Sequence, residues 1–319
     1  MEVINNIAII FMAIFLEALP FLILGSIISA IIERYVSENT ITKLIPKNVF
    51  LGSIVGIFLG FFIPACDCAV IPISKRLIKK KVPLNVSVSF MLSSPIINPV
   101  VLLSTYYAFY KTMPQLFWLR LILGIIVSLV IGIIIGIIFK NKKVIKETLH
   151  EHNHTCHCEH DNNELVLECG ALIEKKVTKK NDKNFFYDII FIIKHAAYDM
   201  FDVLKYLMIG ALFASLIQTL LPTSILSIFK NNKILTIIIL MLFAYFMSLC
   251  STSDSFVGKS LLSSFNSSGI LAYLLLGPMI DIKNTIVLLG NYKKSFVITL
   301  IILIFIVIFI STLLMGVYL

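Results

Sequence analysis

The sequence predicts an all-α, polytopic membrane protein with about eight transmembrane helices in two four-helix halves. Apolar residues make up 58 % of the 319 residues and charged residues only 14 %, against about 25 % in an ordinary soluble domain. The apolar residues come in runs of roughly 17 to 25, the length a helix needs to cross a bilayer, and several motifs of the first half return in the second. The net charge of +9 is spread over the connections, which excludes the basic face of a nucleic-acid-binding protein.

Eight apolar stretches are the predicted crossings. They cover residues 4–32, 49–73, 86–110, 115–139, 185–221, 234–257, 270–289 and 295–317. The first is interpreted as a retained helix and not a cleaved signal peptide, because Met1 to Asn6 carries no positive side chain. The chain then divides into an N-terminal transmembrane repeat (1–139), a His/Cys-rich loop (140–184) and a C-terminal transmembrane repeat (185–319).

Positive side chains concentrate in two connections, and connections of this kind stay in the cytoplasm. An even number of crossings puts both termini on that same side. The sequence therefore predicts a multi-pass protein of the plasma (inner) membrane with cytoplasmic termini and a cytoplasmic His/Cys-rich loop. The positive residues are Lys75, Arg76, Lys79, Lys80 and Lys81 after the second stretch, and Lys140, Lys142, Lys143 and Lys146 after the fourth.

Three features of the first half return in the second at a nearly constant distance. Residues 17–25 parallel residues 202–210 at an offset of 185, Cys66 matches Cys250 at 184, and Pro95 matches Pro278 at 183. Since each half would hold four crossings, we expect a parallel repeat with a pseudo-twofold axis along the membrane normal. Transporters often bind their substrate between two such halves.

Helix breaks are predicted inside several crossings. Proline removes a backbone donor and breaks a helix, and irregular backbone is tolerated at membrane depth only where it is buried or lines a wet cavity. We therefore expect broken helices at the midplane, at two proline pairs and one polar run: Pro64 and Pro72 around residues 66–68, Pro95 and Pro99 around Asn98, and residues 248–255.

Carboxylates inside the crossings are the first candidates for chemistry, because each costs about 2.5 to 3.5 kcal/mol at a helix centre and is rarely without a role. Asp199 and Asp202 have an alternative interpretation: Lys194, His195 and Lys205 beside them suit an amphipathic helix entry at interfacial depth. The residues predicted to carry coupling protons are Glu17, Asp202, Asp254 and Asp281.

The second candidate is the pair Cys66 and Cys68 around Asp67. Thiolates are soft ligands that suit Cu(I), Zn(II) and thiophilic metalloids, although a free cysteine is also a common small core residue. The match with Cys250 favours a substrate-handling site. The predicted substrate pathway comprises Cys66, Asp67, Cys68, Pro95, Asn98, Pro99, Cys250, Asp254, Pro278 and Asp281.

Histidines and cysteines crowd the connection after the fourth crossing. Such tracts are a metal-binding composition, and their ligand types suit Zn(II) or Cu. Their irregular spacing indicates a flexible chelating arm that gathers or senses metal, with a solvated polar linker as the alternative. No cofactor is required for transport itself. The candidate metal ligands are His150, His152, His154, Cys156, His157, Cys158 and His160.

Two segments with later counterparts resemble a known family. Residues 64–72 (PACDCAVIP) and 94–99 (SPIINP), followed by 250–256 (CSTSDSF) and 277–281 (GPMID), are similar to the predicted-permease family DUF318, also called UPF0718, which includes the ArsP organoarsenical efflux permeases. The resemblance spans nearly the whole chain except the His/Cys-rich loop. It implies an eight-helix inner-membrane permease in two bundles and, for some members, export of trivalent organoarsenicals or of copper or zinc.

Together these features predict a secondary-active, proton-coupled permease that exports a soft metal ion or a thiophilic metalloid, and not an enzyme. The expected partners are membrane lipids and the small inorganic or organometalloid substrate, with a homodimer or a small membrane partner also compatible and nucleic acid excluded. One alternative is a membrane thiol redox relay or a metal-sensing or assembly subunit. A channel is a third, and its flux would persist without a proton gradient.

Overall fold

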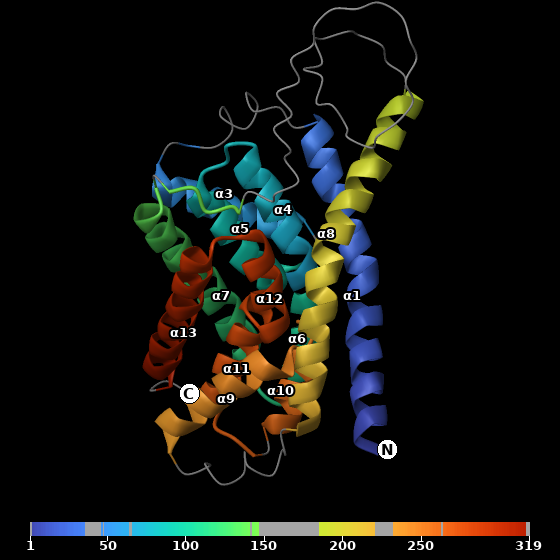
Figure 1. The fold of residues 1–319 in the computed structure, drawn as a ribbon. Helices are drawn as coiled ribbons and strands as arrows, with labels where there is room; N and C mark the ends of the chain where they lie inside the picture. The colour runs from blue at the N-terminus through green and yellow to red at the C-terminus, as the bar shows by residue number, and fades with distance from the viewer. Residues whose placement is uncertain are drawn as a thin grey trace, which may run out of the picture.

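The computed structural model describes residues 2–35, 46, 48–63, 66–140, 142–146, 185–220, 232–262 and 264–316 (Figure 1). Within these ranges the chain is helical, and the only β pairing is an isolated bridge between Ile145 and Tyr292. The helices of the first half are α1 (Glu2–Tyr35), α3 (Val49–Phe62), α4 (Asp67–Lys79), α5 (Leu84–Ile97), α6 (Pro99–Phe109) and α7 (Pro114–Ile138). Those of the second half are α8 (Phe185–Leu220), α9 (Lys233–Met247), α10 (Ser253–Leu261), α11 (Ser267–Met279), α12 (Ile282–Asn291) and α13 (Lys294–Met315).

Helices α3 and α4 form a hairpin that enters and leaves at one end of the bundle. The Asn85 side chain, at the start of α5, donates to the Val49 carbonyl at 2.8 Å, and Ser94, near the end of α5, donates to the Ile63 carbonyl at 3.3 Å. Helix α3 therefore runs beside α5 in the same direction. Because α4 leads from the end of α3 to the start of α5, it must return to the end where α3 began. We call α3 and α4 the first hairpin.

Helices α9 and α10 form a second hairpin of the same kind at the opposite end. Gly269 lies against Thr236 near the starts of α11 and α9, and the rings of Tyr273 and Phe243 lie 6.0 Å apart further along. Helix α9 thus runs with α11. Helix α10 runs against it, since Asp254 lies beside Gly277 and Gly258 beside Leu274. We call α9 and α10 the second hairpin.

The described part contains six candidate membrane crossings, where the sequence predicts eight. They are α1, α5 with α6, α7, α8, α11 with α12, and α13. Helices α3 and α9 have 14 and 15 residues, or about 21 and 23 Å, and fall short of the roughly 30 Å of a bilayer core. The second and sixth apolar stretches each form two short helices and are not among the candidate crossings of the described residues.

The positive segments and the chain ends lie at opposite ends of the bundle. Lys75 donates to the Asn291 side chain at 2.9 Å and the Lys293 amide to the Val144 carbonyl at 2.8 Å, so α4, α7 and α12 all end where α13 starts. We call this the basic end. Helix α1 starts and α13 finishes at the other end (Figure 1). The prediction that the termini share a face with the positive connections is therefore wrong for these helices, because the hairpins change which side each connection reaches.

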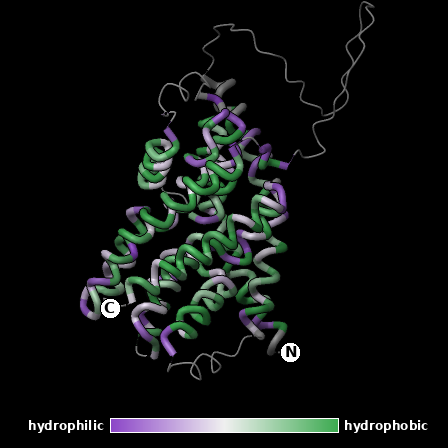
Figure 2. Tube along the Cα trace, turned by 90° about the vertical axis from the view of Figure 1, so that its left-hand side faces the viewer, coloured by the Kyte–Doolittle hydropathy of each residue, from purple (hydrophilic) through white to green (hydrophobic). Residues whose placement is uncertain are grey.

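Helices α5 and α11 form the centre, and most of their side chains are buried. Gly56 and Gly60 of α3 lie directly against α5, since small residues let helix backbones approach closely. Large apolar side chains such as Phe58, Trp118 and Ile193 are exposed on the outside, as lipid contact requires. Hydrophilic residues gather near the ends of the bundle and at a few points within it (Figure 2).

Candidate functional site

The tips of the two hairpins meet inside the bundle. The Ser251 hydroxyl in the second tip donates to the Asp67 carboxylate in the first at 3.2 Å. Helix α9 is followed by its C-cap residue, Ser248, whose backbone is left-handed (φ 47°, ψ 39°). This conformation is uncommon outside glycine. Ser248 is 2 % exposed, and its hydroxyl accepts a hydrogen bond from the Lys283 amide at 3.3 Å. The tips thus contact each other and the start of α12.

Three cysteines converge on a small cavity between these tips and α1. Cys68 is buried and donates to the Asn284 side chain at 3.7 Å, while Cys66 and Cys250 are half-buried. The cavity has a volume of about 20 Å³, enough for one water molecule. It is lined by Ile14, Glu17, Ala18, Phe21, Cys66, Asp67, Cys68, Ser248, Cys250 and Lys283. The structure therefore brings together the predicted residues Glu17, Cys66, Asp67, Cys68 and Cys250.

A buried lysine completes the charges at this site. The Lys283 ammonium lies 3.5 Å from the Asp281 carboxylate and 4.0 Å from the Asp67 carboxylate, and all three side chains are nearly inaccessible. A buried charge needs a partner of opposite sign, and here two carboxylates share one cation. Lys283 is absent from the predicted site. Its signal in the sequence is its position two residues after Asp281, inside an apolar stretch.

The predicted residues Asn98 and Asp281 cap the second helices of two crossings. The Asn98 side chain accepts from the Val100 amide at 3.0 Å with Pro99 in the first turn, and Asp281 accepts from the Asn284 amide at 2.6 Å. Both are preferred N-cap residues. Pro95 and Pro278 lie inside α5 and α11. The cavity between the hairpin tips is not lined by four of the predicted residues, which are Pro95, Asn98, Pro99 and Pro278.

Asp254 belongs to a separate buried cluster around Arg120. Its carboxylate accepts from the Tyr273 hydroxyl at 2.9 Å. Arg120, in α7, is fully buried and donates to the hydroxyls of Thr105 and Ser255 at 2.6 and 2.7 Å. Arg120 and Asp254 are both buried in this cluster. Arg120 is not among the predicted residues, although it is the only charged residue of the apolar stretch 115–139.

The other predicted sites stand apart. Asp199 receives two hydrogen bonds from Arg76, at 2.6 and 3.0 Å, and one from Ser29 at 2.9 Å, all near the basic end. Asp199 lies within the candidate crossing of residues 192–219, and its interfacial interpretation stays a prediction. Asp202 lies in α8, but its side chain is outside what the structure describes. The candidate ligands from His150 to His160 also lie outside the described residues. Among the described residues, those of the cavity included, no three or more His, Cys, Asp or Glu side chains are placed so that they could hold a metal ion.

Comparisons with known proteins agree on one family. The profile of a family described as predicted permease matches residues 3–317. The UPF0718 protein YcgR of Bacillus subtilis (strain 168) is 38 % identical over 312 residues, which cover 96 % of this chain and 95 % of that protein. A putative two-component membrane permease complex subunit of Streptococcus mutans serotype c is 36 % identical over 288 residues, 90 % of this chain and 87 % of that protein. No solved structure matches the chain.

Proposed function

The chain belongs to this family of predicted permeases, and from this premise we propose that it is a secondary-active permease that exports a soft metal ion or a thiophilic metalloid. The observation that carries the proposal is the convergence of Cys66, Cys68 and Cys250 on one cavity between the hairpin tips. Three thiols from two different hairpins offer sulfur ligands that suit Cu(I), Zn(II) or a trivalent arsenical. In the described arrangement no three such side chains are placed so that they could hold a metal ion, so movement of a hairpin would have to bring these ligands together on the cargo and part them again to release it.

Asp67, Asp281 and Lys283 set the charge of this cargo site. Two carboxylates face one ammonium group, so the site holds an excess negative charge that favours a cationic cargo. One oxygen of Asp281, the one 3.5 Å from the Lys283 ammonium, accepts no hydrogen bond among the described residues, so a proton bound there would weaken the ion pair with Lys283. Glu17 lies on the wall of the same cavity. We assign proton coupling to Asp281 and Glu17, while the coupling roles of Asp202 and Asp254 stay predictions.

We also propose that the two halves form an inverted and not a parallel repeat. In support, the order crossing, hairpin, two-helix crossing, crossing occurs twice, and the hairpins enter from opposite ends of the bundle. The hydrogen bond between Ser251 and Asp67 joins residues 184 apart, the offset of the sequence repeat. A pseudo-twofold axis in the membrane plane would pass between the tips, where inverted-repeat transporters place their substrate.

The basic end is proposed to face the cytoplasm of a plasma (inner) membrane. It carries Lys75, Arg76 and Lys79 to Lys81 at the end of the first hairpin, Lys140, Lys142, Lys143 and Lys146 after α7, and Lys293 and Lys294 at the start of α13. Positive residues in short connections stay in the cytoplasm. Helix α1 would then start, and α13 finish, on the outer side.

Transport by the purified full chain in liposomes tests the proposal. With a pH gradient imposed, uptake of Zn(II), Cu(I) or methylarsenite should exceed that of empty liposomes, and Cys66→Ser or Cys250→Ser should reduce it about tenfold or more. Cys169→Ser is the matched control, since Cys169 lies in the 140–184 loop. Equal transport by Cys66→Ser and the control would refute the role of the thiols. Uptake that continues without the pH gradient would point to a channel.

The related streptococcal protein is described as a subunit of a two-component complex, and we propose that this chain also works with a second membrane component. Purification of the tagged chain from its native membrane should yield a second membrane protein in fixed ratio. Recovery of the chain alone, with transport intact, would refute this assignment.

A further inference from the structure

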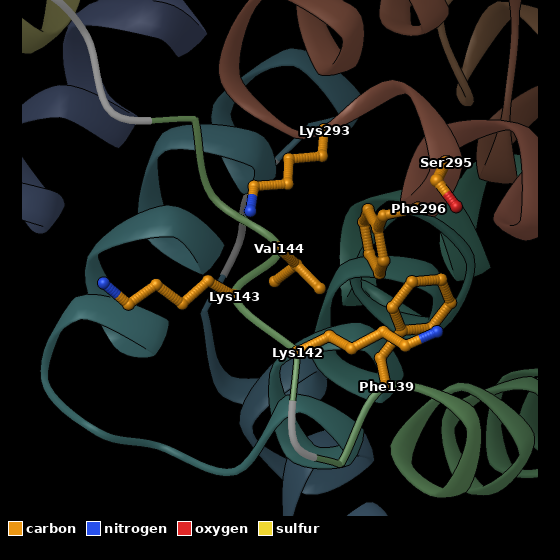
Figure 3. Close-up of a pocket in the computed structure, with 7 residues that line it drawn as sticks. All are labelled: Phe139, Lys142, Lys143, Val144, Lys293, Ser295 and Phe296. Carbon is orange, nitrogen blue, oxygen red and sulfur yellow. The ribbon is translucent and has the colours of Figure 1, made fainter.

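A hollow of about 380 Å³ opens at the basic end, between the end of α7 and the start of α13 (Figure 3). Its floor is formed by Phe139 and Phe296, whose rings pack edge to face 5.6 Å apart and are nearly inaccessible. Lys142, Lys143, Val144, Lys293 and Ser295 complete the lining. The hollow therefore combines an apolar floor with positive charge at its margin, away from the thiol cavity. Lys142 extends over the Phe139 ring, whereas Lys143 and Lys293 extend away from the two rings (Figure 3).

Backbone pairing fixes this margin. Ile145 and Tyr292 form an antiparallel bridge, the Lys293 amide donates to the Val144 carbonyl at 2.8 Å, and the Lys146 amide donates to the Asn291 carbonyl at 3.1 Å. The segment after α7 is thus held against the start of α13. Two lysines are placed on opposite strands of this short pairing, so the positive charge belongs to a defined site and not only to the general surface.

The side chains suit an anionic group with an apolar extension. Lys142 and Lys293 are exposed, and the Lys142 ammonium lies over the Phe139 ring, 5.5 Å from its centroid. No side chain caps α13 at Lys293, so the first amide groups of a 22-residue helix add positive potential nearby. Ile137, Ile138 and Ile298, within two residues of the floor in sequence, are exposed apolar side chains, so the outer surface of the same two helices offers contact for hydrocarbon.

We propose that this hollow binds the phosphate headgroup of an anionic phospholipid, with the acyl chains along α7 and α13. Both helices are candidate crossings, so their ends at the basic end lie at the depth of the headgroups. Basic pockets between transmembrane helices on the cytoplasmic side suit anionic headgroups. The lysines supply the charge complementarity and the two phenylalanines the contact with the glycerol and upper acyl region. The site is independent of the cargo and of the direction of transport.

Native mass spectrometry of the full chain in detergent tests this site, with phosphatidylglycerol, phosphatidylcholine and inorganic phosphate as separate probes. Phosphatidylglycerol should form a one-to-one adduct that phosphatidylcholine at equal concentration does not match. Each lysine near an anionic surface is worth about a fivefold change in affinity, so Lys142→Gln with Lys293→Gln should weaken the adduct about 30-fold. Lys142→Arg with Lys293→Arg should retain it and so exclude misfolding as the cause.

The matched control is Lys79→Gln with Lys81→Gln, which removes the same charge from the same end of the bundle. Retention of the adduct in this pair, with loss in the first, supports the site. Equal loss in both pairs would mean that only the general surface potential attracts the lipid, and would overturn the proposal. Displacement of phosphatidylglycerol by millimolar inorganic phosphate would instead assign the hollow to a soluble anion.

Discussion

The two hairpins share a shape but are held at different points. The first is fixed at its base: Arg76 pairs with Asp199 on α8, and Lys75 with Asn291 on α12, both at the basic end. The second is fixed near its tip, where Arg120 of α7 bonds the Ser255 hydroxyl and the Ser251 carbonyl at 2.7 and 3.4 Å. The tip of the first hairpin is held as well, by the ion pair of Asp67 with Lys283 and the hydrogen bond from Cys68 to Asn284. Those anchors belong to the proposed cargo site, whereas Arg120 anchors the second hairpin outside it. Because binding of cargo would act on the anchors of the first tip and leave the Arg120 anchor in place, we expect the first hairpin to be the one that moves.

The largest expected effect comes from removing the anchor of the second hairpin. Arg120→Met removes the guanidinium that donates to the hydroxyls of Thr105 and Ser255, and it leaves the nearby buried Asp254 without that charge. Two hydrogen bonds from a charged donor contribute about 3–6 kcal/mol. We expect the free energy of unfolding, measured by dodecyl sulfate titration in mixed micelles, to fall by that amount. Arg120→Met with Asp254→Asn should recover part of the loss, because the uncompensated charge is gone. Equal losses in the single and double variants would show that the two charges do not interact.

A smaller effect should distinguish how each hairpin packs on its central helix. A Cβ at Gly56 of α3 would lie 2.3 Å from the Val86 carbonyl, whereas one at Gly269 of α11 would meet the side chains of Leu240 and Thr236 at 2.8 and 2.9 Å. Backbone cannot move aside as side chains can. Gly56→Ala should therefore cost about 1–3 kcal/mol and Gly269→Ala less, in the same titration. The reverse order would mean that the contact between α3 and α5 accommodates an added methyl group more easily than the contact between α9 and α11.

The Asn98 cap, at the break between α5 and α6, should contribute a typical amount to the free energy of unfolding. Asn98→Ala removes the side chain that accepts from the Val100 amide, and loss of such a cap costs about 0.5–2 kcal/mol. Asn98→Ser keeps a capping oxygen and should retain most of the stability. If both variants unfold alike, Asn98 contributes through contacts other than the cap.

The smallest effect is expected at the base of the first hairpin. Arg76 and Asp199 form a two-point ion pair whose side chains are each 16 % exposed, and a partly solvated pair contributes about 1 kcal/mol or less. Arg76→Gln should lower stability by no more than this, yet raise the initial rate of transport if the base restrains the first hairpin. Lys79→Gln, on the same turn, is the control. A loss of stability as large as that of Arg120→Met would contradict the ranking of the two anchors.

The sequence predicted the helical membrane class and the residues at the hairpin tips, because proline, cysteine and carboxylate are conspicuous in apolar stretches. It could not predict that residues 49–73 and 234–257 turn back, since hydropathy counts apolar length and carries no information about direction. Lys283 and Arg120 were missed for a related reason. Each is a single positive charge in an apolar stretch, and a partner of each, Asp67 for Lys283 and Ser255 for Arg120, comes from a distant segment that only the fold brings near.

The serine at the end of α9 has a mechanical consequence. Ser248 makes the left-handed turn of the second hairpin, and its hydroxyl holds the amide of Lys283 at the start of α12. Ser248 therefore links the second hairpin to α12. A shift of the hairpin tip must either carry α12 with it or break that hydrogen bond. Packed interfaces of this kind switch between discrete arrangements and do not deform continuously. We therefore expect the protein to move between a small number of discrete conformations, and Lys283 and its two carboxylates to be placed differently in each.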